Sequence, residues 1–167
     1  LGGIDKDNAA TRVLDALAKA DAAQGLRITV VMGASAPHLD AVRVQAAGMP
    51  MLVEVVAGVS DMGQRMMQAD LCIGAVGSTA WERCALGLPT LQVVLADNQL
   101  EAARHMAAQG LSLALPFPDA PEFADALAAG LDRLSDPASY RAMARSAAAL
   151  TDGSGAKRMA RTLFDRY

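Results

Sequence analysis

The fold of this chain is decided by one stretch, which reads LCIGAVGSTAWERCALGLP over residues 71–89. Residues 71–76 form a short apolar run without helical periodicity, which is typical of a strand buried on both faces. Gly77 interrupts the run, and a helix is expected to begin at Ser78 or Thr79 and to end at the Gly-Leu-Pro sequence. The stretch therefore predicts a strand, a tight turn and a helix.

A turn of this composition at the start of a helix suits an anion. The first backbone N–H groups of a helix have no partner within the helix, and the helix dipole attracts negative charge to them. Gly77 lets a ligand approach the backbone, while Ser78 and Thr79 add hydroxyl donors. Glu82, one turn into the helix, is placed to accept hydrogen bonds from a diol such as a ribose. A phosphate beside a diol indicates a nucleotide.

The same residues allow an alternative that needs no ligand. Thr79 and Glu82 have the spacing of a capping box, in which each side chain bonds a backbone N–H group of its own helix. Under this alternative the turn would only begin a helix.

Composition excludes several classes of protein. The 167 residues are 53% hydrophobic and 20% charged, which indicates a globular domain with a sizeable core. A net charge of −3 argues against general affinity for nucleic acid or anionic membranes. No apolar segment approaches the roughly 20 residues needed to span a bilayer.

The sequence also carries no secretory signal pattern, so we expect a cytoplasmic protein. Its two cysteines, Cys72 and Cys84, lack metal-ligand spacing, and no Asp, Glu and His cluster supplies it. We therefore expect two free buried thiols, no metal and no cofactor.

Strands alternate with helices along the chain. The expected strands lie at residues 26–32, 51–56, 71–76, 91–95 and 111–115. Expected helix caps are Asn8, Ser60 and Asn98, and the helix after Ser60 is expected to turn Met62, Met66 and Met67 inward. The alternation predicts an α/β fold, a Rossmann-like parallel sheet with helices on both faces.

Candidate ligand-binding segments all fall where a predicted strand ends. Ligands bind at the carboxyl ends of strands in such sheets. The segments are 2–5, 58–62, 77–82 and 97–99. Their expected position on one edge favours a nucleotide site over the capping alternative. The Gly-rich turn of residues 2–5 usually follows a strand, so we infer a strand upstream of it.

Several strings of this sequence resemble the C-terminal half of glycosyltransferases of the B fold, including the family 28 C-terminal domains. The strings are VSDM at 59–62, ADLCIG at 69–74, GSTAWERC at 77–84, GLP at 87–89 and DNQ at 97–99. One relative is the N-acetylglucosaminyltransferase that makes lipid II. The string at 77–84 and the Asn-Gln pair look closer to the UDP-sugar hydrolase of pseudaminic acid biosynthesis, which removes UDP from UDP-2,4-diacetamido-2,4,6-trideoxy-β-L-altropyranose. The resemblance covers nearly the whole chain.

The resemblance implies one nucleotide-sugar-binding domain over residues 1–167, the C-terminal half of a B-type fold whose first strand and N-terminal catalytic half lie elsewhere. In such a domain the backbone at Gly58 and Val59 would face the uracil. Glu82 would hold the ribose hydroxyls. The turn from Gly77, with the hydroxyls of Ser78 and Thr79, would hold the diphosphate.

Two further segments follow from the same resemblance. Gly2, Gly3 and Asp5 would line the phosphate or sugar side of the cleft, and Asn98 and Gln99 would reach the sugar.

The catalytic base of the hydrolase family is a histidine of the N-terminal half, which activates water. Neither His38 nor His105 lies at a matching position, so no catalytic residue is expected in this chain. Two positions depart from the family pattern: Val76 replaces an expected glycine, and Ile4 replaces a small residue such as serine.

The sequence therefore predicts the UDP-binding domain of a UDP-sugar hydrolase, inactive without its other half. Two alternatives remain open: the donor-binding half of a UDP-sugar glycosyltransferase, and a non-catalytic domain that binds a nucleotide or a partner. The expected partners are UDP or a UDP-sugar and the N-terminal half of the same protein, with no nucleic acid and no membrane span.

Overall fold

The computed structural model describes Leu1 and residues 3–164, and it contains five parallel strands. The strands are β1 (Arg27–Met32), β2 (Leu52–Ala57), β3 (Cys72–Ala75), β4 (Thr90–Val93) and β5 (Leu113–Leu115). Each begins and ends within two residues of a predicted strand, because short apolar runs between turn residues identify buried parallel strands well.

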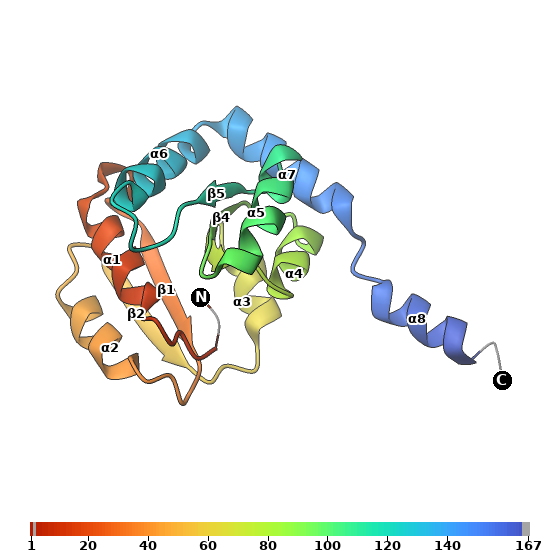
Figure 1. Cartoon of the computed structure of the whole chain (residues 1–167), viewed down its shortest axis with the longest axis horizontal. Helices are drawn as coiled ribbons and strands as arrows, with labels where there is room; N and C mark the ends of the chain where they lie inside the picture. Colours follow the sequence, from red (N-terminus) through yellow and green to blue (C-terminus); the bar gives the residue numbers. More distant parts are fainter. Residues whose placement is uncertain (2, 165–167) are drawn as a thin grey trace.

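The strands form two ladders, where the sequence analysis expected one sheet. β1 pairs with β2, and β3, β4 and β5 pair in that order. Within the described part of the chain, no ladder joins β1 to β3. The backbone N–H of Gly33, just after β1, donates to the carbonyl of Gly3 at 2.9 Å. The N-terminal segment thus lies beside the carboxyl end of β1, and Figure 1 shows it entering between the two groups of strands.

Helices connect the strands and cover both faces. They are α1 (Ala9–Lys19), α2 (Leu39–Ala47), α3 (Met62–Gln68), α4 (Thr79–Ala85), α5 (Leu100–Ala108), α6 (Phe123–Ser135), α7 (Pro137–Leu150) and α8 (Gly155–Phe164), with short 3₁₀ turns η1 (Asp21–Ala23) and η2 (Asp97–Gln99). α1 packs against α2 and α6, and α4 packs against α7. The predicted α/β architecture is confirmed.

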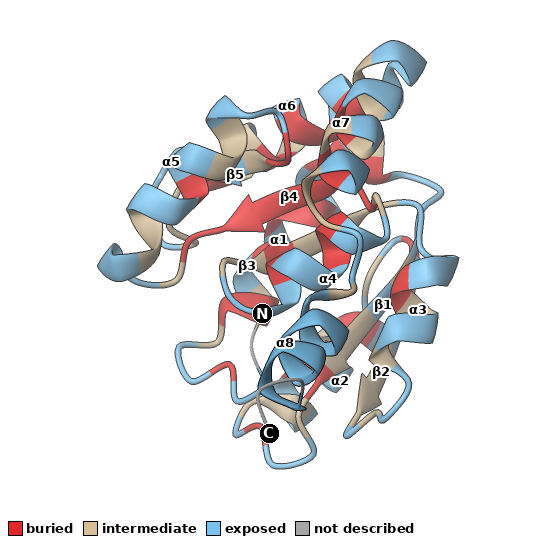
Figure 2. Cartoon of the chain, turned by 90° about the vertical axis from the view of Figure 1, so that its right-hand side faces the viewer, coloured by how far each residue is buried: buried red, intermediate tan, exposed pale blue. Residues whose placement is uncertain are grey.

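The core is centred on β4, every residue of which is buried (Figure 2). Leu91 and Val93 of this strand are completely buried, and each such side chain contributes about 1.5–3 kcal/mol to folding. Gln92 is also fully buried, but its side-chain oxygen accepts a hydrogen bond from the hydroxyl of Ser112 at 2.8 Å. The polar side chain is therefore tolerated in the core because it is paired.

Two of the three predicted helix caps are wrong, and the third is right in its position only. Asn8 occupies the N-cap position of α1 without a side-chain capping bond, Asp61 rather than Ser60 is the N-cap of α3, and Asn98 lies inside η2. In each case the backbone path of the preceding loop decides which side chain reaches the first N–H groups of the helix. The order of residue types in the sequence does not determine that path. Asp5 takes the capping role at α1, as described below.

The prediction that three methionines of α3 point inward is also only partly right. Met66 is buried, but Met67 is 65% exposed. Adjacent residues of a helix are about 100° apart around its axis, so Met67 turns away from the core when Met66 points into it.

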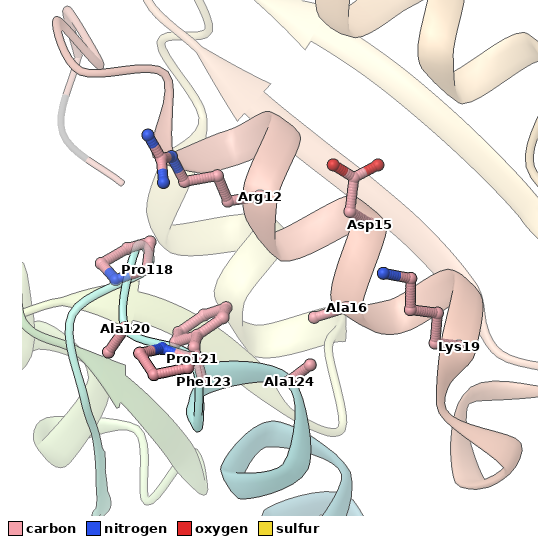
Figure 3. A pocket seen from close by; sticks show the side chains of 9 residues that line it. All are labelled: Arg12, Asp15, Ala16, Lys19, Pro118, Ala120, Pro121, Phe123 and Ala124. Carbon is pink, nitrogen blue, oxygen red and sulfur yellow. The ribbon is translucent and has the colours of Figure 1, made fainter.

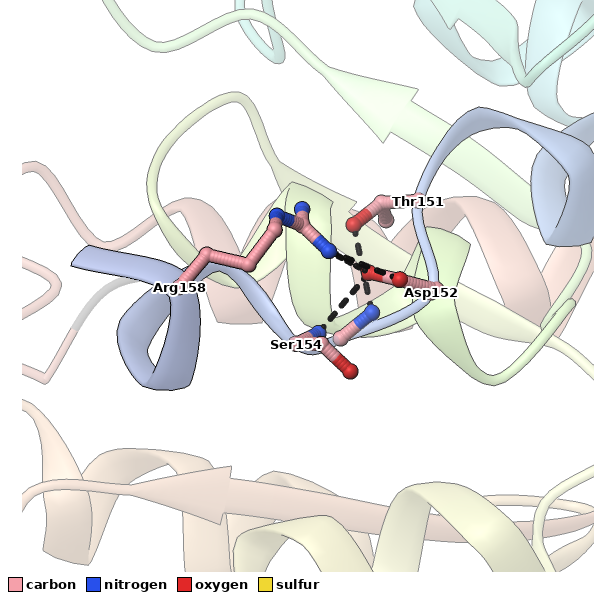
Figure 4. A network of polar contacts seen from close by, with 5 residues as sticks. Thr151, Asp152, Ser154 and Arg158 are labelled. Carbon is pink, nitrogen blue, oxygen red and sulfur yellow. Dashed lines mark hydrogen bonds and ion pairs between the residues drawn. The ribbon is translucent and has the colours of Figure 1, made fainter. Parts of the chain in front are cut away.

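The last helix, α8, extends away from the body of the domain (Figure 1). In the turn before it, the backbone N–H of Ser154 donates to Asp152 at 2.9 Å, and Arg158 forms an ion pair with Asp152 at 2.7 Å (Figure 4). Its apolar residues Met159, Leu163 and Phe164 are all more than half exposed, Phe164 to 80%. None of the described helices is long and apolar enough to cross a membrane.

Candidate functional site at the carboxyl edge of the strands

The candidate segments lie where the strands end. The turn of residues 76–78 follows β3, η2 follows β4 after a short loop, and Gly58 follows β2. The N–H of Gly58 donates to the carbonyl of Met32 at 2.9 Å, which joins the end of β2 to the end of β1. Because the strands of each ladder are parallel, these segments share the carboxyl edge of their ladder.

The turn between β3 and α4 presents polar groups to solvent. Gly77, Ser78 and Thr79 are all exposed. Ser78 already has helical dihedral angles, and the carbonyls of Gly77 and Ser78 accept the N–H groups of Ala80 and Trp81. Within the described residues, the N–H groups of positions 77, 78 and 79 meet no acceptor. The turn therefore offers backbone donors and hydroxyls to a ligand.

The capping alternative for this turn is wrong. Ser78, not Thr79, is the N-cap, and it makes no side-chain capping bond. Glu82 consequently lies one position too late for a capping box, which needs the acidic residue three positions after the cap. The hydroxyl of Thr79 instead accepts a hydrogen bond from Arg83 at 3.2 Å. The polar residues of this turn are left available for another purpose.

Glu82 lies on the first turn of α4 and is exposed. Among the described residues no ion pair or side-chain hydrogen bond engages its carboxylate. An exposed carboxylate one helical turn from open N–H donors can accept hydrogen bonds from the hydroxyls of a ligand whose anionic part sits at the turn.

Gly58 ends β2 in a conformation that suits only glycine. Its φ angle is +64°, and a Cβ atom at this position would lie 3.0 Å from the Cβ of Ala34. The following Val59 is half-buried, so Gly58 and Val59 expose mainly backbone atoms to solvent. This arrangement leaves the expected uracil contact possible through main-chain groups.

Asp5 has a different task from the one predicted. It is buried, and its two carboxylate oxygens accept hydrogen bonds from the N–H groups of Ala9 and Ala10, each at 2.9 Å. These are the first residues of α1, so Asp5 caps this helix and occupies its anion-binding groups. Gly3 is exposed, and Gly2 lies outside the described residues.

Asn98 and Gln99 differ in their surroundings. Asn98 is exposed in η2, whereas the side-chain oxygen of Gln99 accepts a hydrogen bond from the N–H of Leu95 at 2.9 Å. Gln99 therefore ties η2 to the end of β4, and its amide N–H groups remain as donors. Asn98 is the freer of the two to meet a ligand.

Sequence reasoning missed one residue of this site, Arg83. Its side chain is only 4% exposed and lies behind the turn of residues 76–78. The signal was present in the sequence: Arg83 is three residues after Ala80 and one before Cys84, both of which are buried, so helical spacing places it on the inner face of α4.

The cysteines offer no reactive group. Burial raises the pKa of the Cys72 thiol and of the Cys84 thiol, and the nearby positive charge of Arg83 only partly offsets this effect. Both thiols are therefore protonated at neutral pH and poor nucleophiles. Among the described residues, no three His, Cys, Asp or Glu side chains gather as a metal site would require.

Two shallow cavities lie beside α1. One of about 160 Å³ is lined by Asp7 and Arg12 of this region, by Leu95 and by the loop at 117–119. The other, of about 180 Å³, lies between α1 and the start of α6, with Arg12 at its rim (Figure 3). Neither is lined by a residue that the sequence predicted for the site, and Gly77, Ser78 and Thr79 of the predicted turn are exposed.

Comparison with known proteins identifies the family to which this chain belongs. The model of the glycosyltransferase family 28 C-terminal domain matches residues 3–162, and the chain belongs to this family. The match includes every described candidate segment.

The individual relatives match only part of this chain, and each is longer than the segment that it matches. The spore coat polysaccharide biosynthesis protein SpsG of Bacillus subtilis (strain 168) is 31% identical over 115 residues, which are 69% of this chain and 34% of SpsG. The UDP-N-acetylglucosamine–N-acetylmuramyl-(pentapeptide) pyrophosphoryl-undecaprenol N-acetylglucosamine transferase of Chromobacterium violaceum is 41% identical over 116 residues, 63% of this chain and 32% of the relative. A protein of the same name from Helicobacter pylori (strain G27) is 39% identical over 69 residues, 41% of this chain and 20% of the relative. The chain spans about a third of the length of the first two.

These findings correct the predicted activity. The family description and the Chromobacterium violaceum relative both name a transferase, and the comparisons support no hydrolase. The predicted UDP-sugar hydrolase is therefore wrong. The strings at 77–84 and 97–99 lie within the family match, so they identify the domain rather than the reaction.

Proposed function

We propose that this chain is the donor-binding half of a glycosyltransferase that uses a UDP-sugar. The observation that carries the proposal is the family match over residues 3–162, since it spans the whole carboxyl edge described above. The name of the Chromobacterium violaceum relative, which contains a UDP-sugar, supports UDP as the nucleotide.

The geometry supports a division of roles along this edge. The open N–H groups and hydroxyls of the turn at 77–79 hold the diphosphate, which carries the negative charge. Glu82 accepts hydrogen bonds from the ribose. The backbone at Gly58 faces the base, and Asn98 and Gln99 face the sugar.

In a transfer reaction the developing charge is on the leaving diphosphate. Donors fixed around that diphosphate stabilise the charge as the glycosidic bond breaks. This domain then orients the donor sugar and stabilises its leaving group, while the acceptor and the base come from the other half of the protein.

A second half is supported by α8. Its Met159, Leu163 and Phe164 are all more than half exposed, which is costly for a helix that remains in water. The relatives are about three times as long as the matched segment, so an additional domain is available to cover this face.

Nucleotide binding is tested by calorimetric titration with UDP, with ADP and CDP as controls for the base. We expect UDP to bind and the two controls to bind at least about tenfold more weakly. Equal affinity for the three nucleotides would contradict a uracil contact at Gly58 and Val59.

The reaction is tested with the full-length protein, a UDP-sugar and separate candidate acceptors. A transferase releases UDP rapidly only when an acceptor is present and moves the sugar to that acceptor. Rapid UDP release into water without an acceptor would contradict the transferase. UDP binding without turnover of any UDP-sugar would favour a non-catalytic domain.

A further inference from the structure

Arg83 joins the two ends of the turn that faces the proposed diphosphate. One terminal nitrogen of its guanidinium donates to the carbonyl of Ala75, the last residue of β3, at 2.9 Å. The other donates to the hydroxyl of Thr79, the first residue of α4, at 3.2 Å. The planar guanidinium thus spans the turn from its buried side, and both its contacts are at the turn's ends.

Room for this guanidinium depends on Gly74. A Cβ atom at position 74 would lie 2.7 Å from a terminal nitrogen of Arg83 and 3.1 Å from its central carbon. Any other residue at position 74 would force the guanidinium to move. A glycine inside a strand often marks such a close approach, and here the approaching group is a charged side chain.

The positive charge of Arg83 is not neutralised by a nearby carboxylate. Among the described residues no Asp or Glu lies within ion-pairing distance of it, and both its acceptors are neutral oxygens. A buried charge is costly unless something compensates it. An anion bound on the exposed side of the same turn supplies that compensation across a thin layer of backbone.

The contact with Arg83 also fixes the hydroxyl of Thr79. Because the Thr79 oxygen accepts the bond from Arg83, its own hydrogen is free to donate elsewhere. Thr79 is exposed, so that donor is available to a ligand at the turn.

We propose that Arg83 is a positioning residue, which holds the turn of residues 76–78 and the Thr79 hydroxyl in the arrangement that binds the diphosphate of the nucleotide sugar. The inference rests on the proposed function. It goes beyond that function because it makes phosphate affinity depend on a buried side chain that does not touch the ligand.

The test compares UDP with uridine in the full-length protein, by calorimetry for UDP and ligand-observed NMR for uridine. R83M should weaken UDP binding by about tenfold, the range of a charge-assisted contact, and uridine binding by less than about twofold. R83K keeps the charge but loses the planar fork, so UDP binding should fall by about threefold with uridine unchanged. R43M, which removes an exposed arginine of α2, is the matched control and should change neither affinity.

Each result decides the proposal. Unchanged UDP affinity in R83M and R83K, or an equal loss for UDP and uridine, would overturn the positioning role. A wild-type protein that binds uridine but gains nothing from the diphosphate would overturn it too, and one that binds neither ligand would show instead that the proposed function has failed. If R83M does not fold, the ratio of UDP to uridine affinity in R83K gives the answer.

Discussion

The start of α1 and the start of α4 satisfy their backbone in opposite ways. At α1, the buried carboxylate of Asp5 accepts hydrogen bonds from the N–H groups of Ala9 and Ala10. At α4, no side chain caps the helix, and a buried arginine lies behind the turn. The protein supplies its own negative charge at the first helix and positive charge at the second.

This difference teaches where an anion can bind. A phosphate at α1 would meet occupied donors and the charge of Asp5, so it is repelled there. At α4 the donors are open and the charge of Arg83 is attractive. Glycine-containing turns precede both helices, so the side chains around each turn, rather than the turn residues themselves, distinguish a cap from a binding site.

Removing the internal cap should have the largest effect. D5A deletes both hydrogen bonds to the start of α1 and should lower the free energy of unfolding by about 2 kcal/mol, the upper end for a helix cap. Denaturant unfolding measures the loss. UDP affinity, measured under conditions in which D5A is folded, should stay within about twofold of wild type.

D7A is the matched control for this prediction, because Asp7 is exposed and lies in the same loop. It should leave stability nearly unchanged. If D5A instead lost UDP affinity at unchanged stability, Asp5 would belong to the ligand site and the contrast between the two helices would fail.

Removing the proposed ribose contact should have a comparable effect on affinity and almost none on stability. E82A should weaken UDP binding by about 1.5–3 kcal/mol, the range for hydrogen bonds to a charged group. The helix should remain intact, because Glu82 makes no capping bond. Calorimetry of wild type and variant gives the difference.

The sharper form of this test uses 2′-deoxy-UDP, for which the wild-type protein and E82A should differ less than for UDP. E101A, on the exposed first turn of α5, serves as the control for losing a surface carboxylate. Equal affinity of E82A and wild type for UDP would refute the ribose role.

The smallest effect concerns a third helix start, that of α7. Asp136 caps this helix by accepting the N–H of Ser139 at 2.8 Å, and hydrogen bonds from Ser139 lower the pKa of its carboxyl. Because the pKa in the folded state is below that in the unfolded state, the contribution to stability is complete above the unfolded value and is lost as the pH falls through the folded one.

D136A should therefore be less stable than wild type at neutral pH, and the two proteins should converge as the pH falls into the acidic range. Denaturant unfolding from neutral to strongly acidic pH measures this. D132A, which removes an exposed carboxylate from α6, should show no such convergence. A difference between D136A and wild type that is independent of pH would contradict the capping role.

Local patterns predicted the elements of this fold well. The strands follow from apolar runs, and α4 begins at Thr79 and ends before the Gly-Leu-Pro sequence, as predicted. These features depend on residues that are close in the chain. The family resemblance was likewise confirmed because its strings cover the chain.

Features that depend on the exact backbone path of a loop were not predictable in this way. Asn8 and Asp5 are both good caps by composition, and a loop in which both have positive φ angles decides between them. The capping box at Thr79 was lost to a one-residue shift in the start of α4. The reaction itself could not be predicted, since the strings at 77–84 and 97–99 identify the family domain rather than the chemistry.

The division of the strands into two ladders has a mechanical consequence. Within the described residues, contacts between helices such as α1 and α6, rather than backbone pairing, connect the two groups of strands. The base contact proposed at Gly58 belongs to one group, and Glu82 belongs to the other. A nucleotide that touches both would act as a cross-brace, stiffening the domain against a shearing motion between its two parts.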